Sequence, residues 1–413
     1  MPHPASASPA LSLLAASAVR ERANRLLELG LAGDLEHFTV DLSHLPALAD
    51  RVIATTRRRY PDLAVPLQSC WRHFEAGGLD RWDMLAGARG FADVREMGRA
   101  AFDLAIVSCV TNAHPGTSWH YAEDVSGELF AGPAGLSIAS LAMLASGLFS
   151  AVPEDPLRAD AHALMRIEEA ELVAGFQSGP GNRLEGLAGR MTLLNRLGEA
   201  IGLRPDLFAR EDEPRPGGLF DILYDEGQQG AIPAVRILDL VLEGLGPVWP
   251  ERTVLNGIGL GDTWGHSRLV TADATSGLMP LHMLSQWIAG SLIEPLAWAG
   301  VEVFELSALT GLADRDHCVL FLDSGILLPR DLAEAKQPHE PGSEYVTECR
   351  ALTVALLDQL ALSIRRELQA TEDDLPLSCI VEGGTRAAGR EIAREKRADG
   401  VGPVNILSDG TVF

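Results

Sequence analysis

The feature that most constrains the fold is a helical repeat of apolar residues that recurs along nearly the whole chain. In residues 12–29 the apolar side chains approximate the i, i+3, i+4, i+7 spacing of one helix face: Leu13, Leu14, Val19, Ala23, Leu26, Leu27 and Leu29. Such a stripe is typical of an amphipathic helix that packs against a core. Similar stretches predict further long helices at residues 45–60, 94–110, 184–203, 231–245, 281–298 and 345–368.

Strand-like segments are few and short. Residues 253–260 hold an Asn-Gly pair between apolar arms, which is a strong hairpin signal, and residues 406–413 repeat the pattern with Asp-Gly. Residues 119–130 and 319–328 are two further hairpin candidates, the second with Asp323-Ser324-Gly325 as its turn. Because strands and helices do not alternate, a doubly wound parallel sheet is not expected. We predict a mainly α fold, a large helical domain with a few β-hairpins.

The length of 413 residues suits one large domain or two to three smaller ones. Residues 204–218 are rich in Pro and Gly, which fits either a long surface loop or a boundary. We therefore expect a single helical domain over residues 1–413, or two closely packed halves that meet near residues 204–218. Residues 1–9 are predicted to be a disordered lead, because no Lys or Arg precedes the apolar run as a secretory signal would require.

The charge of the chain excludes several kinds of partner. It holds 34 Lys and Arg against 57 Asp and Glu, a net charge of −23, which disfavours nucleic acids and anionic membranes. No apolar stretch reaches the roughly 18–20 residues of a membrane span, and residues 136–149 are predicted as a buried, Ala-rich helix. The five cysteines form no C-x-x-C pair and are odd in number, which fits a reducing cytoplasm. We predict a cytoplasmic protein with a small-molecule substrate, and make no prediction of its oligomeric state.

A first candidate cluster lies at residues 71–82, where two Trp, two Arg, a His and two acidic residues stand close together. We predict that Trp71, Arg72, His73 and Glu75 bind substrate, because a guanidinium can bind a phosphate or carboxylate in bidentate fashion. The alternative, a structural loop held by Arg–carboxylate pairs and Trp packing, is equally open.

A second candidate cluster combines a short extended segment with a helix start. Asp262, Trp264 and His266 alternate, so they face one side of an extended chain, and His282 and Gln286 share a helix face. We predict Asp262 and His282 as catalytic, with little contribution to stability, and the other three as substrate-binding. We predict no metal. We also predict no cofactor, and no standard nucleotide-binding loop is present. Two alternatives are a divalent metal on Asp262, His266 and His282, and a polar cap over the helix N-terminus with His282 as a core residue.

A third candidate lies at residues 382–385, which read Glu-Gly-Gly-Thr before a predicted helix at 387–396. We predict that Glu382 and Thr385 bind substrate, with Thr385 as the helix N-cap and the glycines as an anion cradle. An ordinary capped loop is the alternative.

One acidic residue stands inside an apolar run. Asp103 lies within the predicted helix 94–110, and a buried carboxylate costs several kcal/mol unless it is paired. Arg99, one turn before it, is the expected partner.

The chain also resembles a known family over residues 18–413. The stretches that carry the resemblance are residues 57–61, 71–78, 243–250, 284–287, 309–312, 350–358, 382–385 and 408–413. Together they look like the uracil catabolism protein four family of microbes that degrade pyrimidines through a ribosylated intermediate. The chain departs from the family pattern at residues 280–283, 312–318 and 386.

The resemblance implies a step between a ribosylurea-type intermediate and free urea. From it we expect a hydrolase that cleaves an N-glycosidic C–N bond of a ribosylurea-like compound or its 5-phosphate. No residue roles come from the family, so the site residues above rest on their own chemistry. The absence of a self-sufficient catalytic motif supports the alternative of a non-catalytic ligand-binding or partner subunit.

Overall fold

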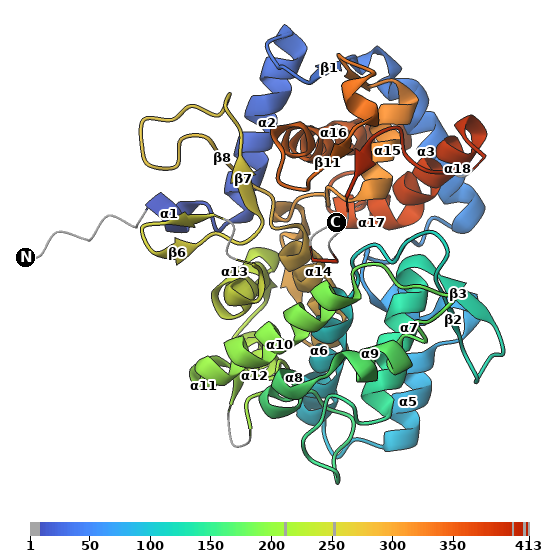
Figure 1. Cartoon of the computed structure of the whole chain (residues 1–413), viewed down its shortest axis with the longest axis vertical. Helices are drawn as coiled ribbons and strands as arrows, with labels where there is room; N and C mark the ends of the chain where they lie inside the picture. Colours follow the sequence, from blue (N-terminus) through green and yellow to red (C-terminus); the bar gives the residue numbers. More distant parts are fainter. Residues whose placement is uncertain (1–8, 210–212, 251–252, 399, 408–409, 412–413) are drawn as a thin grey trace, which may run out of the picture. The chain divides into compact units, whose positions relative to one another are not determined.

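The computed structural model describes residues 9–209, 213–250, 253–398, 400–407 and 410–411. Helices dominate these residues, and strands occur in pairs (Figure 1), which confirms the mainly α prediction. Within the described part of the chain, no helix is both long and apolar enough to cross a membrane.

Two compact units make up the chain. The first holds Met1–Gln68, Glu251–Gln286 and Glu305–Leu407, and the second holds Ser69–Pro250, Trp287–Phe304 and Ser408–Phe413. Residues 204–218 lie within the second unit. The organisation of the chain as one domain, or as two halves that meet near residues 204–218, stays a prediction.

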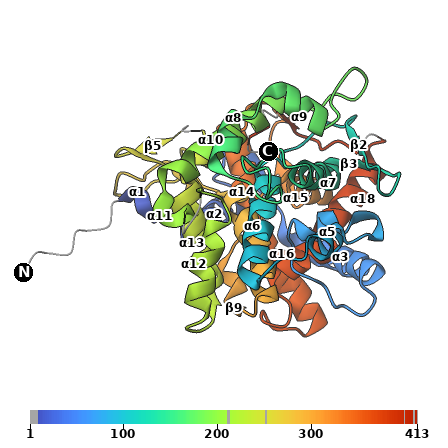
Figure 2. The same cartoon turned by 90° about the horizontal axis from the view of Figure 1, so that it is seen from below.

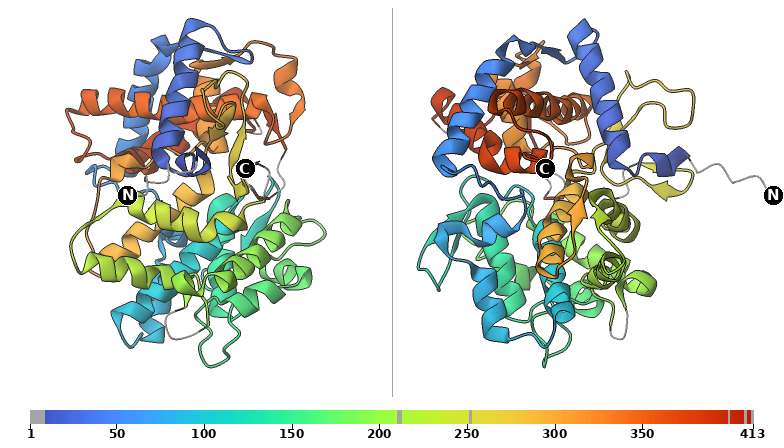
Figure 3. Two further views of the ribbon diagram at one scale, coloured as in Figure 1. Left: turned by 90° about the vertical axis from the view of Figure 1, so that its left-hand side faces the viewer. Right: turned by 180° about the vertical axis from the view of Figure 1, so that it is seen from behind.

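The first unit is built around the long helix α16 (Glu344–Leu368). Ser343 caps its start by accepting a hydrogen bond from the backbone N–H of Val346, and most of its side chains are buried. Helices α2 (Ala16–Ala32) and α3 (Leu45–Arg59) pack against it and lie on either side of it in Figures 1 and 3. The unit's other helices are α1 (Pro9–Ser12), η1 (Leu42–His44), η4 (Leu306–Ala308), α15 (Arg315–Ser324), η5 (Glu334–Lys336), α17 (Leu377–Ile380), the π-helical turn η6 (Val381–Thr385) and α18 (Arg386–Lys396).

Short strand pairs complete the first unit. The predicted hairpin at 253–260 is confirmed, with Asn256 and Gly257 both at positive φ in its turn. The antiparallel pairs are β1 (Phe38–Val40) with β10 (Leu327–Pro329), β5 (Val254–Leu255) with β6 (Ile258–Gly259), and β7 (Thr263–Gly265) with β8 (Leu278–Pro280). The parallel pair is β11 (Pro338–His339) with β12 (Asn405–Ile406).

The second unit is centred on α6 (Val94–Val110), which has the bounds that the apolar spacing predicts. Its C-terminal half is buried on all sides, with α7 (Gly132–Ala145) on one flank and α12 (Gly218–Gly227) on the other (Figure 2). The unit's other helices are α4 (Trp71–Phe74), η2 (Ala76–Gly78), α5 (Arg81–Arg89), α8 (Ala161–Arg166), α9 (Glu169–Gly175), α10 (Leu187–Leu203), α11 (Pro205–Phe208), α13 (Ala234–Leu245) and η3 (Gly246–Val248). Helix α14 (Met283–Trp298) begins in the first unit and continues into the second. The strand pairs are the predicted hairpin β2 (His120–Ala122) with β3 (Leu129–Ala131), and the parallel pair β4 (Ile232–Pro233) with β9 (Val303–Phe304).

The hairpin predicted at residues 319–328 is wrong. Helix α15 continues through Asp323 to Ser324, and Gly325 ends it in the left-handed conformation, donating hydrogen bonds to carbonyls of the last turn. The strand that follows, β10, pairs with β1 instead of folding back. The Asp-Ser-Gly sequence is therefore a helix C-terminus and not a hairpin turn.

The expected pairing of Asp103 with Arg99 is also wrong. Asp103 accepts hydrogen bonds from Arg215 Nε at 2.9 Å and Nη2 at 2.7 Å, and from the backbone N–H of Ala159 and Gly217. Arg99 pairs with Asp221, its Nε lying 2.8 Å from Oδ2. A chain separation of 112 residues places the true partner of Asp103 beyond the reach of local spacing.

Two predicted features fall partly outside the described residues. The lead at residues 1–9 is described only at Pro9, which starts α1. Of the hairpin predicted at 406–413, Ser408, Asp409, Val412 and Phe413 lie outside, while Ile406 belongs to β12.

Candidate functional site

Asp262 is buried in the first unit, directly before β7, and both of its carboxylate oxygens are engaged. Oδ1 accepts from Arg350 Nη1 at 2.9 Å and from Trp264 Nε1 at 2.6 Å. Oδ2 accepts from Arg350 Nη2 at 2.8 Å and from the backbone N–H of Met283 at 3.0 Å. Burial raises the pKa of Asp262, but the charge and hydrogen bonds of Arg350 outweigh it and bring the pKa to about 2. The carboxylate is therefore ionised and holds both Arg350 and the start of α14.

His282 directly precedes α14 and has a positive φ of 47°. Its backbone N–H donates to the carbonyl oxygen of Asp262 at 3.3 Å. Its Nε2 lies 2.8 Å from the carbonyl oxygen of Leu13, so Nε2 carries the proton and donates it. Burial lowers the pKa of His282, which favours the neutral imidazole. Asp262 and His282 thus adopt the polar-cap arrangement that the sequence leaves open. Because both side chains are buried, we now expect them to contribute more to stability than their polarity suggests.

His266 forms a buried pair with Glu348. Its Nδ1 accepts from the backbone N–H of Arg268 at 3.2 Å, and its Nε2 lies 3.3 Å from Glu348 Oε2. The other oxygen of Glu348 accepts from the backbone N–H groups of Phe38 at 2.9 Å and His37 at 3.2 Å. Glu348 therefore links β1, α16 and the segment after β7.

Gln286 and Trp264 are buried in the same unit. Gln286 closes a pair with Thr310, donating to Oγ1 at 2.7 Å and accepting from the backbone N–H at 2.9 Å. The Trp264 ring packs against Gly342, where an added Cβ would come within 2.3 Å of a ring carbon. Both side chains support neighbouring backbone.

The segment at residues 382–385 is not a loop before a helix. It forms the π-helical turn η6, which joins α17 to α18 without a break, so the predicted N-cap at Thr385 is wrong. Thr385 Oγ1 instead lies 3.2 Å from the Val381 carbonyl oxygen and 2.9 Å from His317 Nε2. Glu382 accepts from Arg59 Nη2 at 2.9 Å and from the Tyr60 hydroxyl at 3.0 Å.

The two glycines of η6 allow close packing and do not form an anion cradle. A Cβ at Gly384 would lie 2.6 Å from both the Thr56 hydroxyl and the Val52 carbonyl oxygen of α3. The backbone of η6 is thus occupied by α3. This contact explains the Gly-Gly pair in physical terms.

Arg72 in the second unit stands in a partly exposed polar cluster. Its Nη1 donates to Glu75 Oε2 at 2.9 Å, and its Nη2 donates to Glu294 of α14, which also accepts from the Ser69 hydroxyl. The side chains of Arg72 and Glu294 are each 18% exposed, and that of Glu75 is 39% exposed. Two carboxylates and one guanidinium therefore meet within reach of solvent.

His73 and Trp71 are the sequence neighbours of Arg72 on α4. His73 Nδ1 lies 3.1 Å from the hydroxyl of Ser137, which also accepts from Asn112 Nδ2 at 2.9 Å. Trp71 is buried, donates from Nε1 to the Ser291 carbonyl oxygen at 2.8 Å, and contacts the Trp298 ring edge-on. The burial of Trp71 favours the structural alternative for this segment, and the partial exposure of His73 favours the substrate-binding one.

Comparison with known proteins gives a match over almost the whole chain. Residues 12–413 match a family described as "Protein of unknown function (DUF1688)". The chain belongs to this family. "Protein urg3" of Schizosaccharomyces pombe is 32% identical over 411 residues, which cover 97% of this chain and 98% of that protein. "Uracil catabolism protein 4" of Lachancea kluyveri is 30% identical over 433 aligned positions, covering 96% and 97% of the two chains. Family membership, expected from the resemblance, is therefore confirmed.

In this family member the candidate residues are divided between the two units. Asp262, Trp264 and His282 meet in the first unit, as do Glu382 and Thr385 at η6, while residues 71–75 belong to the second unit. Among the described residues, no three His, Cys, Asp or Glu side chains gather as a metal would need. A single site that uses all of the candidates stays a prediction.

Three residues that complete these clusters are not among the site residues predicted from the sequence. Arg350 and Glu348 lie on α16 and complete the buried pairs, and Glu294 completes the Arg72 cluster. One signal for Glu294 is present in the sequence, because it is the only charged residue in the sixteen residues of α14. A lone carboxylate in an apolar helix needs a partner, and that need marks it as a candidate.

Proposed function

We propose that this protein acts in uracil catabolism as a hydrolase that cleaves the N-glycosidic C–N bond of a ribosylurea-like compound and releases urea. Support for the pathway comes from the full-length similarity to a protein named for uracil catabolism. Support for the reaction comes from the ribosylated intermediate that the family resemblance implies. The helical fold alone favours no reaction, because function resides in a site and not in a fold.

The observation that carries the proposal is the Arg72 cluster. Among the candidate residues, it combines a guanidinium and two carboxylates at partial exposure, and the next residue along the chain, His73, has a partly exposed imidazole. Asp262 offers the opposite situation, since its carboxylate is buried and fully hydrogen-bonded. The groups of the Arg72 cluster are more open to solvent than Asp262 is, and this difference favours them as the groups that meet a substrate.

The chemistry assigns roles to Glu294, His73 and Arg72. Cleavage of an N-glycosidic bond builds positive charge on the sugar, which a carboxylate such as Glu294 stabilises, and the leaving nitrogen needs a proton, which His73 supplies. As the C–N bond breaks, a water molecule forms the new C–O bond and releases its second proton to solvent. Arg72 binds a phosphate or the sugar hydroxyls. In this proposal Asp262 and His282 maintain the first unit, and the catalytic roles considered for them pass to Glu294 and His73.

Direct assay tests the proposal. Purified protein is incubated with ribosylurea and, separately, with its 5-phosphate, and urea is measured over time. We expect urea from at least one substrate, and no urea above background from either would contradict the proposal. Arg72→Lys should lower the rate sharply because lysine lacks the bidentate fork.

A matched control separates this effect from a general loss of charge pairing. Arg204 also lies in the second unit and donates to two carboxylates, Asp206 at 2.8 Å and Glu243 at 2.9 Å. Arg204→Lys should leave the rate unchanged. Equal losses of rate in the two variants would show that Arg72 has no special role in the reaction.

The alternative function, a non-catalytic ligand-binding subunit, is favoured by one observation. Every ionised group of the Arg72 cluster already has a protein partner, as in a structural ion-pair network. This alternative predicts that ribosylurea raises the melting temperature but that no urea forms. The same two incubations, with melting curves added, decide between the functions.

A further inference from the structure

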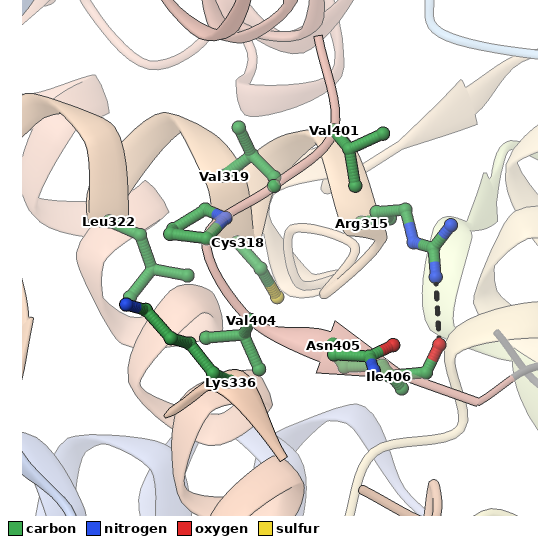
Figure 4. Close-up of a pocket in the computed structure, with 11 residues that line it drawn as sticks. Arg315, Cys318, Val319, Leu322, Lys336, Val401, Val404, Asn405 and Ile406 are labelled. Carbon is green, nitrogen blue, oxygen red and sulfur yellow. Dashed lines mark hydrogen bonds between the residues drawn. The ribbon is translucent and has the colours of Figure 1, made fainter. Parts of the chain in front are cut away.

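A cavity of about 230 Å³ lies in the first unit between α15 and residues 401–406. Gly402 closes one wall against Val319, where an added Cβ would come within 2.5 Å of a side-chain carbon. Figure 4 shows the Cys318 sulfur in the middle of the lining side chains, with Arg315 and Lys336 on opposite sides. The volume is below the roughly 300–1,000 Å³ of pockets for drug-sized ligands, so it suits a small metabolite.

The charge of the cavity is opposite to that of the protein. Arg315 and Lys336 are the charged residues among those that line it, and both are cations. This is unexpected in a chain of net charge −23 with only two lysines, Lys336 and Lys396. Arg315 Nη2 donates to the Ile406 carbonyl oxygen at 2.9 Å and so fixes one wall.

Lys336 is the group that an incoming anion would meet. Its side chain is exposed, and the structure records no hydrogen bond or ion pair for it within the described residues. The remaining lining is mostly apolar, with Val319, Leu322 and Val404 among its side chains. An anion with a short apolar body matches this combination.

The thiol of Cys318 provides a chemical probe of the cavity. The Thr353 hydroxyl donates to its sulfur at 3.4 Å, and a hydrogen bond with Cys349, together with this one, holds the pKa of the Cys318 thiol below its ordinary value despite burial. All five cysteines are buried, and the four others do not line the cavity.

We propose that this cavity binds a small organic carboxylate, with the charge at Lys336 and the apolar body against α15. A carboxylate fits better than a phosphate, because a phosphate usually requires several converging donors and Lys336 supplies a single point charge. This binding site does not rest on the proposed hydrolase function. It would hold a product, an effector or a second substrate of carboxylate type.

Paired alkylating reagents test the proposal on the full-length protein. Iodoacetate is a small carboxylate, iodoacetamide is its neutral analogue, and with either one the Cys318 sulfur forms a C–S bond as iodide leaves. The rates at Cys318 are followed by peptide mass spectrometry and divided by the rates of the same reagents with glutathione. We expect the iodoacetate rate at Cys318, normalised in this way, to exceed the iodoacetamide rate roughly fivefold.

Three variants locate the effect. Lys336→Ala should abolish most of the iodoacetate preference, Lys336→Arg should retain it, and Lys396→Ala, at the other lysine, should not change it. Butyrate should slow the alkylation of Cys318 more than butyramide does. Equal normalised rates, a preference that survives in Lys336→Ala, or a Cys318 that resists both reagents would overturn the proposal.

Discussion

At the scale of single residues, the buried ion pair of Asp262 with Arg350 organises the first unit. Each carboxylate oxygen accepts one guanidinium hydrogen bond, and the Trp264 indole and the first backbone N–H of α14 take the remaining positions. Neither partner can be removed without leaving the other charged and buried. Such pairs are costly to break even where their net contribution is small.

Asp262→Asn should therefore destabilise the protein by about 3–5 kcal/mol, because Arg350 would remain buried without its counter-charge. Guanidinium unfolding followed by circular dichroism measures the change. Asp34→Asn, at an exposed residue of the same unit, is the control and should stay within about 0.5 kcal/mol of the parent. An Asp262→Asn variant as stable as the parent would show that the pair is not a structural support.

The residue scale also shows what local spacing can predict. The alternation of Asp262 and Trp264 places them on one side, and the hydrogen bond of 2.6 Å between them confirms it. The partner Arg350 stands 88 residues away and could not be predicted from spacing. Polar residues that need a partner can be recognised from sequence, whereas the identity of a distant partner requires the fold.

At the scale of elements, apolar spacing predicts the long helices well, and α6 has both of its predicted ends. The failures occur where a short apolar run meets turn-like residues. Residues 319–325 have the composition of a hairpin arm and turn, yet the run is the end of α15 and its glycine is the C-cap. Short runs of this kind suit a strand or a buried helix equally, so periodicity alone cannot separate the two.

The π-helical turn η6 offers a test at the same scale. Gly384→Ala places a Cβ 2.6 Å from the Thr56 hydroxyl and from the Val52 carbonyl oxygen, and the backbone atom cannot move aside cheaply. We expect a loss of stability of about 1–3 kcal/mol, measured by chemical unfolding.

Gly87→Ala in helix α5 is the matched control for this substitution. A Cβ at Gly87 meets no heavy atom within 4 Å, so alanine should stabilise the helix by about 0.5–1 kcal/mol. Opposite signs for the two Gly→Ala changes are the expected result. A neutral Gly384→Ala would mean that α3 and η6 are not tightly packed.

At the scale of the whole molecule, the depressed pKa of Asp262 links stability to pH. The folded protein holds this carboxyl at a pKa of about 2, below its ordinary value of 3.8. The resulting stabilisation is present above pH 4 and is lost as the pH falls from about 4 to about 2. It amounts to about 2 kcal/mol for this group.

Unfolding measured at pH 5, 4, 3 and 2 checks this linkage. The parent protein should lose about 2 kcal/mol more across pH 4 to 2 than Asp262→Asn does, because the variant has no carboxyl to protonate at this position. Parallel curves for the two proteins would contradict the assigned pKa direction.

The sequence predicts the family of this protein, and the structure shows which of the candidate residues are exposed. The family could be recognised from sequence stretches alone, and the comparisons confirm it. Asp262 and His282, the residues predicted to be catalytic, are buried and hydrogen-bonded. The sequence could not predict this burial, because a polar residue type does not reveal whether its side chain is exposed. The structure directs attention to Glu294, whose contacts with Arg72 and Ser69 form only in the folded second unit.

The assignment of the reaction to the Arg72 cluster is tested most directly by the Glu294→Gln variant. Its rate of urea release from ribosylurea or its 5-phosphate is compared with that of the parent. Glu199→Gln, at an exposed residue of the same unit, is the control. We predict that Glu294→Gln lowers kcat by about 10²–10³-fold while its melting temperature stays close to that of the parent and of the control. Urea release at the parental rate by Glu294→Gln would contradict the assignment of the reaction to the Arg72 cluster.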